Sequence, residues 1–236
     1  MVIVCLQVTD SVAPVPERRL IDDDLEALKS QLMKMGTLAE ERVQAAIEGL
    51  VLGDQFQIRD IIDGDKPIND LQMDIDDRCF RIIALHQPVA VDLRYVVAAT
   101  RISVDLERVG DLAVNIAETA DRYLEHRPVK PLIDLPRMSA IAEGMLKTAL
   151  DAFLQRNASL AHSVLGQDDQ LDELKNQVFR ELLTYMLGDP HTIEPGIDLI
   201  LIARHLERIG DHATNIAEDA IFVTEARDPR HGAEPR

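Results

Sequence analysis

Hydrophobic residues recur every three or four positions along most of the chain, which is the spacing of one face of an α-helix. The pattern is clearest in two segments that repeat each other. DLERVGDLAVNIAE at 105–118 and HLERIGDHATNIAE at 205–218 agree at ten of fourteen positions. At about 100° per residue, the apolar side chains of each copy fall within about 40° of one direction, so each copy predicts a long helix with one buried face. These apolar stripes consist of Ile102, Leu106, Val109, Ala113, Ile116 and Ala120, and of Ile202, Leu206, Ile209, Ala213, Ile216 and Ala220.

The duplication covers most of the chain. The segment from Met35 aligns with the segment from Met138, and Asp65 aligns with Asp168, at a displacement of 103 residues. The displacement falls to 100 before the third helix of each copy, because the loops that precede those helices differ in length. The expected organisation is a flexible N-terminal extension at 1–21, a first repeat at 22–126, a second repeat at 127–226 and a disordered tail at 227–236.

Each repeat is expected to contain three helices. Asp54 and Asn157 are good N-caps for the second helix of each repeat, and Gly64 and Gly166 interrupt that helix. No segment alternates apolar and polar residues between turn signals, so the predicted fold class is all-α: two tandem, similar three-helix bundles. The expected helices of the first repeat are about 24–52, 54–86 and 91–126, and Pro190 and Pro195 are expected in the last connection of the second repeat.

A second stripe of oxygen-bearing side chains lies opposite the apolar stripe in both copies. Its members fall at about 140–220° from the direction of the core. Successive members are three or four residues apart, which places them about 5–6 Å from each other on a helix. These acidic stripes consist of Glu107, Asp111, Asn115 and Glu118 in the first repeat, and of Glu207, Asp211, Asn215 and Glu218 in the second.

Two interpretations of the acidic stripes are open. An ordinary solvated helix face looks the same, and common ancestry would preserve it in both repeats. Like charges one turn apart destabilise a helix unless a cation compensates, however, and carboxylate oxygens are good metal ligands. No Glu-x-x-His motif occurs on an expected helix, which disfavours a buried di-iron centre, so the pattern predicts an all-oxygen cluster on a convex outer face. His205 and His212 have no counterparts in the first repeat and are expected at the surface.

Two further residue types recur with the stripes. Arg108 and Arg208 are expected to form salt bridges that fix the packing of the bundle. Gly110 and Gly210 lie in the middle of predicted helices, where glycine costs about 1 kcal/mol relative to alanine. Their presence in both repeats predicts a close approach of another helix at these points.

The composition narrows the range of functions. A net charge of −17 over 236 residues, with 3% aromatic residues and no tryptophan, argues against a nucleic-acid partner and favours cations or basic protein surfaces. Two cysteines, Cys5 and Cys79, indicate a reduced, cytoplasmic setting, and the start of the chain lacks the features of a signal peptide. No phosphate-binding loop or nucleophile motif is present, so an enzyme is not expected.

The twin segments ERVGDLAVNIAE from Glu107 and ERIGDHATNIAE from Glu207, together with QPVAVDLR from Gln87, resemble the signature segments of the PhoU family of phosphate-uptake regulators. The resemblance covers about 24–224 and implies two three-helix bundles lying side by side. It further implies a cytoplasmic negative regulator of phosphate uptake and of the phosphate-starvation (Pho) regulon. Such a regulator is an adaptor between the ATPase of a phosphate ABC transporter and a membrane sensor histidine kinase, and a homodimer is expected.

The resemblance also implies a metal. Similar members of the family bind multinuclear iron or zinc clusters through E(D)xxxD motifs, which here are Glu107 with Asp111 and Glu207 with Asp211. The other four members of the acidic stripes would extend these sites. Two alternative functions remain: a metal-dependent hydrolase that activates water at the carboxylate clusters, and a purely structural helical scaffold.

Overall fold

A computed structural model of the protein describes residues 20–64 and 66–227. Residues 1–19 of the predicted extension at 1–21 and residues 228–236 of the predicted tail at 227–236 lie outside the described residues, as does Asp65, whereas residues 20 and 21 belong to the first helix. Every regular element in the described part is helical, as the all-α prediction requires. None of these helices is both long enough and apolar enough to span a bilayer. The elements are α1 (Leu20–Leu52), α2 (Gln55–Asp63), α3 (Lys66–His86), α4 (Ala90–Tyr123), α5 (Asp134–Gln155), α6 (Ala158–Leu165), α7 (Asp168–Gly188), the 3₁₀ turn η1 (Pro190–Thr192) and α8 (Ile193–Glu225).

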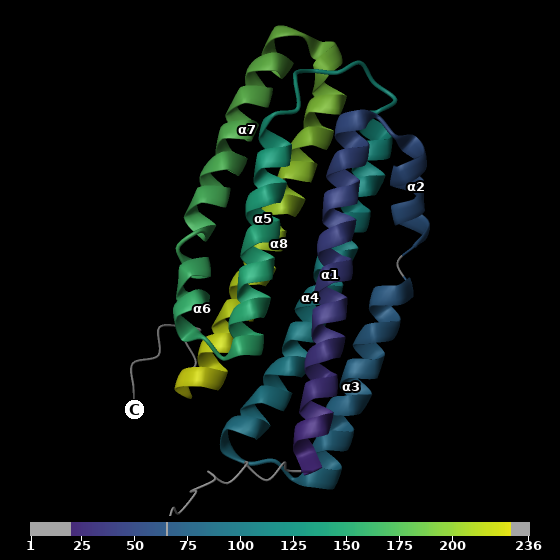
Figure 1. Cartoon of the computed structure of the whole chain (residues 1–236). Coiled ribbons are helices and arrows are strands. Elements are labelled where there is room, and N and C mark those ends of the chain that lie inside the picture. Colours follow the sequence, from purple (N-terminus) through teal and green to yellow (C-terminus); the bar gives the residue numbers. More distant parts are fainter. Residues whose placement is uncertain (1–19, 65, 228–236) are drawn as a thin grey trace, which may run out of the picture.

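The helices form two similar three-helix bundles that lie side by side (Figure 1). The broken second helix of each repeat, α2–α3 or α6–α7, packs on the two long helices of the same repeat. The repeats meet through α4 with α8 and through α1 with α5, so these four long helices form the centre of the molecule. The α4 and α8 helices run antiparallel, and the α2–α3 and α6–α7 pairs lie at the outer sides (Figure 1).

Local signals place the helix ends where the sequence predicts them. The Asp54 carboxylate accepts hydrogen bonds from the backbone N–H groups of Phe56 and Gln57, at 3.0 and 3.1 Å, and so caps α2. The Asn157 side chain caps α6 in the same way. The predicted interruptions at Gly64 and Gly166 separate α2 from α3 and α6 from α7.

Three helix boundaries differ from the prediction. The first helix begins at Leu20, four residues early, and α4 ends at Tyr123 rather than near His126. Pro195 lies in the first turn of α8 and not in the preceding connection. Proline is tolerated there because the first N–H groups of a helix have no acceptor within it.

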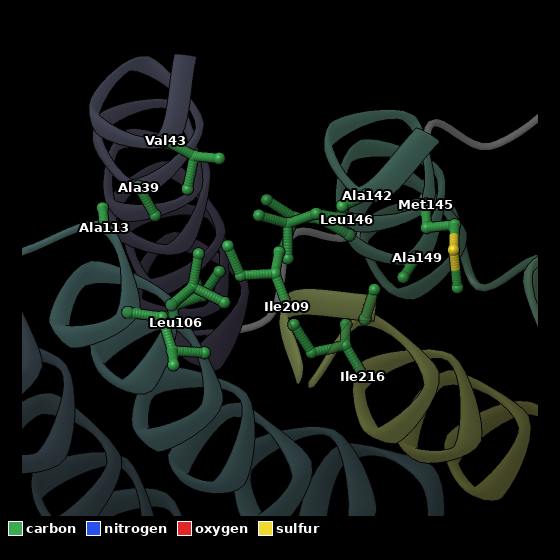
Figure 2. Close-up of a cluster of buried hydrophobic side chains, with 14 of the residues drawn as sticks. Ala39, Val43, Leu106, Ala113, Ala142, Met145, Leu146, Ala149, Ile209 and Ile216 are labelled. Carbon is green, nitrogen blue, oxygen red and sulfur yellow. The ribbon is translucent and has the colours of Figure 1, made fainter. Parts of the chain in front are cut away.

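The apolar stripes form the core. All of their residues are completely buried, and Leu106, Ile209 and Ile216 meet side chains of α1 and α5 (Figure 2). Glycine allows the outer helices to approach, as predicted. A Cβ atom added to Gly110 would lie 2.9 Å from Ile68 Cδ1, and one added to Gly210 would lie 2.6 Å from Leu171 Cδ2. Ile68 and Leu171 are themselves counterparts at the displacement of 103.

The contact between α1 and α5 contains half-buried carboxyl groups. Burial is the main cause that raises the pKa of Glu40 on α1, to about 7. The charge of Lys147 opposes this shift, whereas Glu143, Asp151 and Glu41 add to it. Glu143, the counterpart of Glu40 on α5, also has a raised pKa, chiefly through burial. Both repeats therefore bring a carboxyl group that resists ionisation to the contact between them.

Replacing Glu40 by glutamine is expected to reduce the pH dependence of stability. Folding raises the pKa of this carboxyl from 4.5 to about 7, so the folded state binds more protons in that window and loses stability as pH rises through it. The variant should be more stable than the wild type at pH 8, by on the order of 1 kcal/mol for this part-exposed group, and similar below pH 4.5. Urea unfolding across this range measures the effect. Exposed Glu173→Gln is the control, and parallel pH profiles for wild type and Glu40→Gln would refute the prediction.

Candidate functional site

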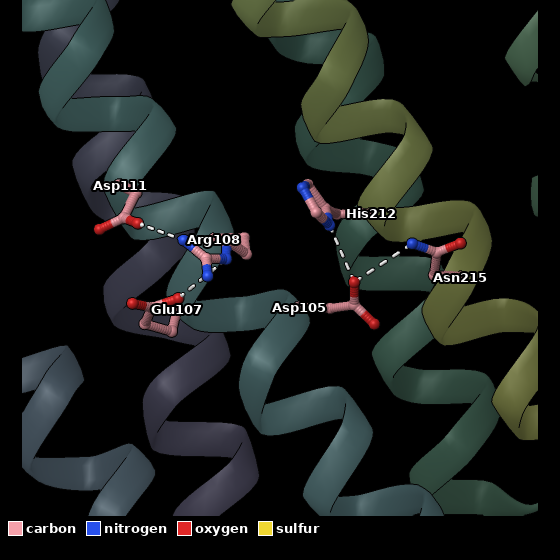
Figure 3. Close-up of polar contacts among 6 residues, drawn as sticks. All are labelled: Asp105, Glu107, Arg108, Asp111, His212 and Asn215. Carbon is pink, nitrogen blue, oxygen red and sulfur yellow. Dashed lines mark hydrogen bonds and ion pairs between the residues drawn. The ribbon is translucent and has the colours of Figure 1, made fainter.

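The carboxylates of the first acidic stripe are paired with a cation from their own helix. The Arg108 guanidinium lies 3.2 Å from Asp111 Oδ2 and 3.5 Å from Glu107 Oε2 (Figure 3). This arginine supplies the positive charge that carboxylates one turn apart require. Its described contacts lie within α4, so the predicted role of Arg108 in fixing the bundle is not observed.

The second acidic stripe has a different partner. Lys175 Nζ on α7 lies 2.6 Å from Glu207 Oε1 and 2.8 Å from Asp172 Oδ1. Arg208, the counterpart of Arg108, makes no hydrogen bond or ion pair with any described residue. The difference follows from the sequence of the outer helix, because the counterpart of Lys175 in the first repeat is the uncharged Gln72.

Four carboxyl groups of the second repeat come together between α7 and α8. This acidic cluster consists of Asp168, Asp172, Glu207 and Asp211. Partial burial is the main cause that raises the pKa of Asp211, and the negative charges of the other three raise it further. The pKa of Asp168 is raised by burial and by the charges of acidic neighbours that include Asp172 and Glu207. The carboxylates are therefore close enough together to disfavour the ionisation of Asp168 and Asp211.

Sequence reasoning missed Asp168 and Asp172. The signal was present, because these two residues have the same aspartate-x-x-x-aspartate spacing as the motifs on the third helices. In the first repeat the corresponding positions are Asp65, which lies outside the described residues, and Asn69. By sequence, the second repeat therefore has four carboxylates at these positions and the first repeat has three.

The sequence predicts that the Glu207 and Asp211 carboxylates lie on a convex face, but in the fold they lie at a hollow. Glu207 and Asp211 line a hollow of about 530 Å³ between α7 and α8, together with Lys175, Phe179 and Ile200. Within 20–64 and 66–227, no group of three or more Asp, Glu, His or Cys side chains has a spacing that would hold a metal ion.

The remaining members of the acidic stripes have separate surroundings. Asn215 Nδ2 donates a hydrogen bond to Asp105 Oδ1 on α4 at 3.2 Å, so this amide faces the other repeat (Figure 3). Asn115 and Glu218 are half-buried, and Glu118 is exposed.

Polar contacts across α4 and α8 fix the two repeats in register. His212 Nδ1 lies 2.8 Å from Asp105 Oδ1, and both side chains are more than four-fifths buried (Figure 3). Arg101 contacts buried Asp219 at 3.2 Å further along the same seam. His212 and the half-buried His205 are therefore not surface residues, contrary to the prediction, since the antiparallel packing of α4 covers this side of α8.

Comparison with known proteins relates both repeats to one family. The sequence matches the PhoU domain twice, over residues 32–120 and 135–220. It is 43% identical over 197 residues to the phosphate-specific transport system accessory protein PhoU homolog of Caulobacter vibrioides. The matched region covers 83% of this chain and 86% of that protein. The homolog from Aquifex aeolicus is 42% identical over 208 residues, covering 88% of this chain and 94% of the relative.

Solved structures agree with the sequence matches. The crystal structure of PhoU from Pseudomonas aeruginosa superposes with a TM-score of 0.83 at 36% identity, covering 88% of this chain and all of that chain. The phosphate transport system regulatory protein PhoU from Streptococcus pneumoniae gives a TM-score of 0.80 at 29% identity, covering 88% of this chain and 98% of that chain. With two copies of its domain, its twin motifs and its fold in common with these proteins, the chain belongs to the PhoU family.

Proposed function

We propose that this protein restrains phosphate uptake and the phosphate-starvation genes, as a cytoplasmic adaptor between the ATPase of a phosphate ABC transporter and a sensor histidine kinase. The observation that carries the proposal is the match of both repeats to proteins named as accessory to phosphate-specific transport. A non-catalytic role is consistent with the sequence, which contains no nucleophile motif or phosphate-binding loop.

Two unlike hollows support an adaptor with two partners. They occupy corresponding places, between α3 and α4 in the first repeat and between α7 and α8 in the second. The first hollow, of about 700 Å³, is lined by Phe80 and Val104 and carries Asp76, Asp105 and Asp219 with one basic side chain, Arg101. The second, of about 530 Å³, carries three basic side chains, Lys175, Arg204 and Arg208, with Glu207 and Asp211. Duplicated helices that differ in charge suit two different binding surfaces.

Binding of the two signalling proteins tests the proposal. The purified chain should retain the transporter ATPase and the cytoplasmic part of the histidine kinase of its own organism in a pull-down at physiological ionic strength. Attraction between exposed charges extends over about 8 Å at physiological ionic strength, and added salt shortens this distance. Association through such charges should therefore weaken at high salt. Retention of neither protein would contradict the adaptor function.

We also propose that the acidic cluster of the second repeat holds iron or zinc. The donor type fits, because iron and zinc accept carboxylate oxygens, and burial together with neighbouring negative charges raises the pKa of Asp168 and Asp211. The side chains would have to move closer together around the ion, since no described group has the spacing of a metal site. A bound metal ion would supply positive charge to these carboxylates in addition to the charge of Lys175. The Glu107–Asp111 motif is the weaker site, since Arg108 already neutralises it. No observation on the described residues favours the alternative of a water-activating hydrolase site.

Replacing Glu207 and Asp211 together by alanine is expected to remove the metal of the second repeat and leave the fold intact. Both side chains point away from the core, so the change relieves repulsion between carboxylates and costs little stability. Elemental analysis of protein purified without an affinity tag or chelator measures the metal per chain. The exposed pair Asp169 and Glu173, changed to alanine together, is the control. Equal metal content in both variants would show that the ligands are wrongly assigned.

A further inference from the structure

Two arginines on α8 line the hollow between α7 and α8, although the protein is strongly acidic. It has 42 acidic and 25 basic residues. Arg204 and Arg208 lie one helical turn apart, and both are exposed. Neither guanidinium makes a hydrogen bond or ion pair with any residue that the structure describes. Both line the hollow between α7 and α8.

The combination of two arginines at these positions is specific to the second repeat. Their counterparts in the first repeat are the apolar Val104 and Arg108, which pairs with carboxylates of its own helix. The positive charges of these arginines affect the neighbouring His205. The pKa of half-buried His205 is lowered, first by burial and then by the positive charges of Arg208, Arg204 and Arg122. The guanidinium groups of Arg204 and Arg208 are therefore close enough to His205 to disfavour its protonation.

An exposed apolar strip continues from these arginines. Phe179 and Leu183 on α7 are 48% and 41% exposed, and Ile193 and Ile197 on α8 are 44% and 48% exposed. Phe179 lines the hollow itself. At about 100° per residue, the other three fall within the arc of their helix that lines the hollow. Contiguous exposed apolar side chains of this size mark a binding surface.

The hollow with its two arginines and the exposed apolar strip together form one groove along α7 and α8. The α7 and α8 helices lie side by side and antiparallel, joined through η1 (Figure 1). From Ile193 to Arg208 the groove is about 22 Å long, the length of a helix of about fifteen residues. Its apolar part lies near η1, and its basic part lies toward the middle of α8.

We propose that this groove binds an acidic amphipathic helix of a partner protein. The apolar face of that helix would pack on Phe179, Leu183 and Ile197, and two carboxylates one turn apart would pair with Arg204 and Arg208. The two arginines favour a partner that carries carboxylates, because the planar guanidinium group binds a carboxylate through two parallel hydrogen bonds. A small anion would use the arginines and leave the apolar strip uncovered.

Repulsion by the rest of the acidic protein does not prevent this contact. Charges more than about 8 Å away are largely screened at physiological ionic strength, so the local balance decides. Locally, Lys175 is paired with both Glu207 and Asp172, and the other carboxyl groups of the acidic cluster are Asp168 and Asp211. Of the charged side chains that line the hollow, Lys175 and Arg204 lie nearest to the apolar strip and Asp211 lies furthest from η1, so a helix on the strip meets basic groups first.

A designed peptide tests the groove. The probe is a fluorescently labelled, helix-forming peptide of about fifteen residues, with leucines on one face and two glutamates one turn apart near one end. A twin peptide carries lysines in place of the glutamates. Fluorescence anisotropy measures the binding of each peptide to the wild type, to Arg204→Glu with Arg208→Glu, to Phe179→Ser, and to a charge-matched control, Arg59→Glu with Arg81→Glu, at exposed positions of the first repeat.

The acidic peptide should bind the wild type and the control alike. It should bind the Arg204/Arg208 variant at least about tenfold more weakly, because two charge-assisted contacts become repulsive, and the lysine peptide should prefer that variant. Phe179→Ser should weaken both peptides, and unchanged circular dichroism would exclude unfolding as the cause. Equal binding of the two peptides to the wild type, or no difference between the Arg204/Arg208 variant and the control, would overturn the proposal. The inference rests on the proposed adaptor function for its partner, but the assay contains no partner protein, so its failure is distinct from failure of that function.

Discussion

Replacing Phe153 by alanine is expected to lower the free energy of unfolding by about 3–5 kcal/mol. Phe153 on α5 is completely buried, and its ring stacks on that of Tyr95 on α4, with centroids 4.5 Å apart and planes 16° from parallel. The guanidinium of Arg156 lies 5.1 Å from the centroid of the Tyr95 ring. The chain has only five phenylalanines and three tyrosines, so this buried aromatic pair is unusual in a core made mainly of aliphatic side chains.

The loss should exceed that at an ordinary core position for a further reason. Phe153 belongs to the second repeat and Tyr95 to the first, so the stacked rings contribute to the contact between the repeats. Urea unfolding followed by circular dichroism measures the effect. Phe56→Ala is the matched control, because this ring is 84% exposed and its removal should cost less than about 0.5 kcal/mol. Similar losses in the two variants would mean that Phe153 does not fill the core as described.

Features set by local spacing could be predicted from the sequence. The period of the apolar stripes, the caps at Asp54 and Asn157 and the breaks at Gly64 and Gly166 all depend on residues within a few positions of one another. The contacts at Gly110 and Gly210 are long-range, yet they were predictable, because a glycine that recurs in the middle of a helix indicates a neighbour that leaves no room for a side chain.

Features that depend on the contact between separate helices could not be predicted. The sequence places Arg108 and Arg208 at equivalent positions, but Lys175 on α7 decides that only one of them pairs with its own helix. Similarly, His212 meets Asp105 because α4 and α8 pack antiparallel in one register, which neither helix specifies alone. Charged residues have many alternative partners of similar energy, so their pairing follows from the packing rather than determining it.

The proposed metal ligands depend on both kinds of feature. The spacing of Glu207 and Asp211 identifies them as a pair from the sequence alone. The contribution of Asp168 and Asp172 depends on α7 lying beside α8, which became visible only in the fold. The hollow between these helices arises from the same packing, and it replaced the convex face that a single helix suggests.

Transcription of phosphate-starvation genes in a strain that lacks this protein tests the proposed function most directly. If the protein is the adaptor through which the transporter restrains the kinase, its removal leaves the kinase active regardless of phosphate. These genes should then be expressed in phosphate-rich medium at close to their starvation level, and a plasmid copy of the wild-type gene should restore repression. Normal repression of the same genes in the deletion strain, in phosphate-rich medium, would contradict the proposed function.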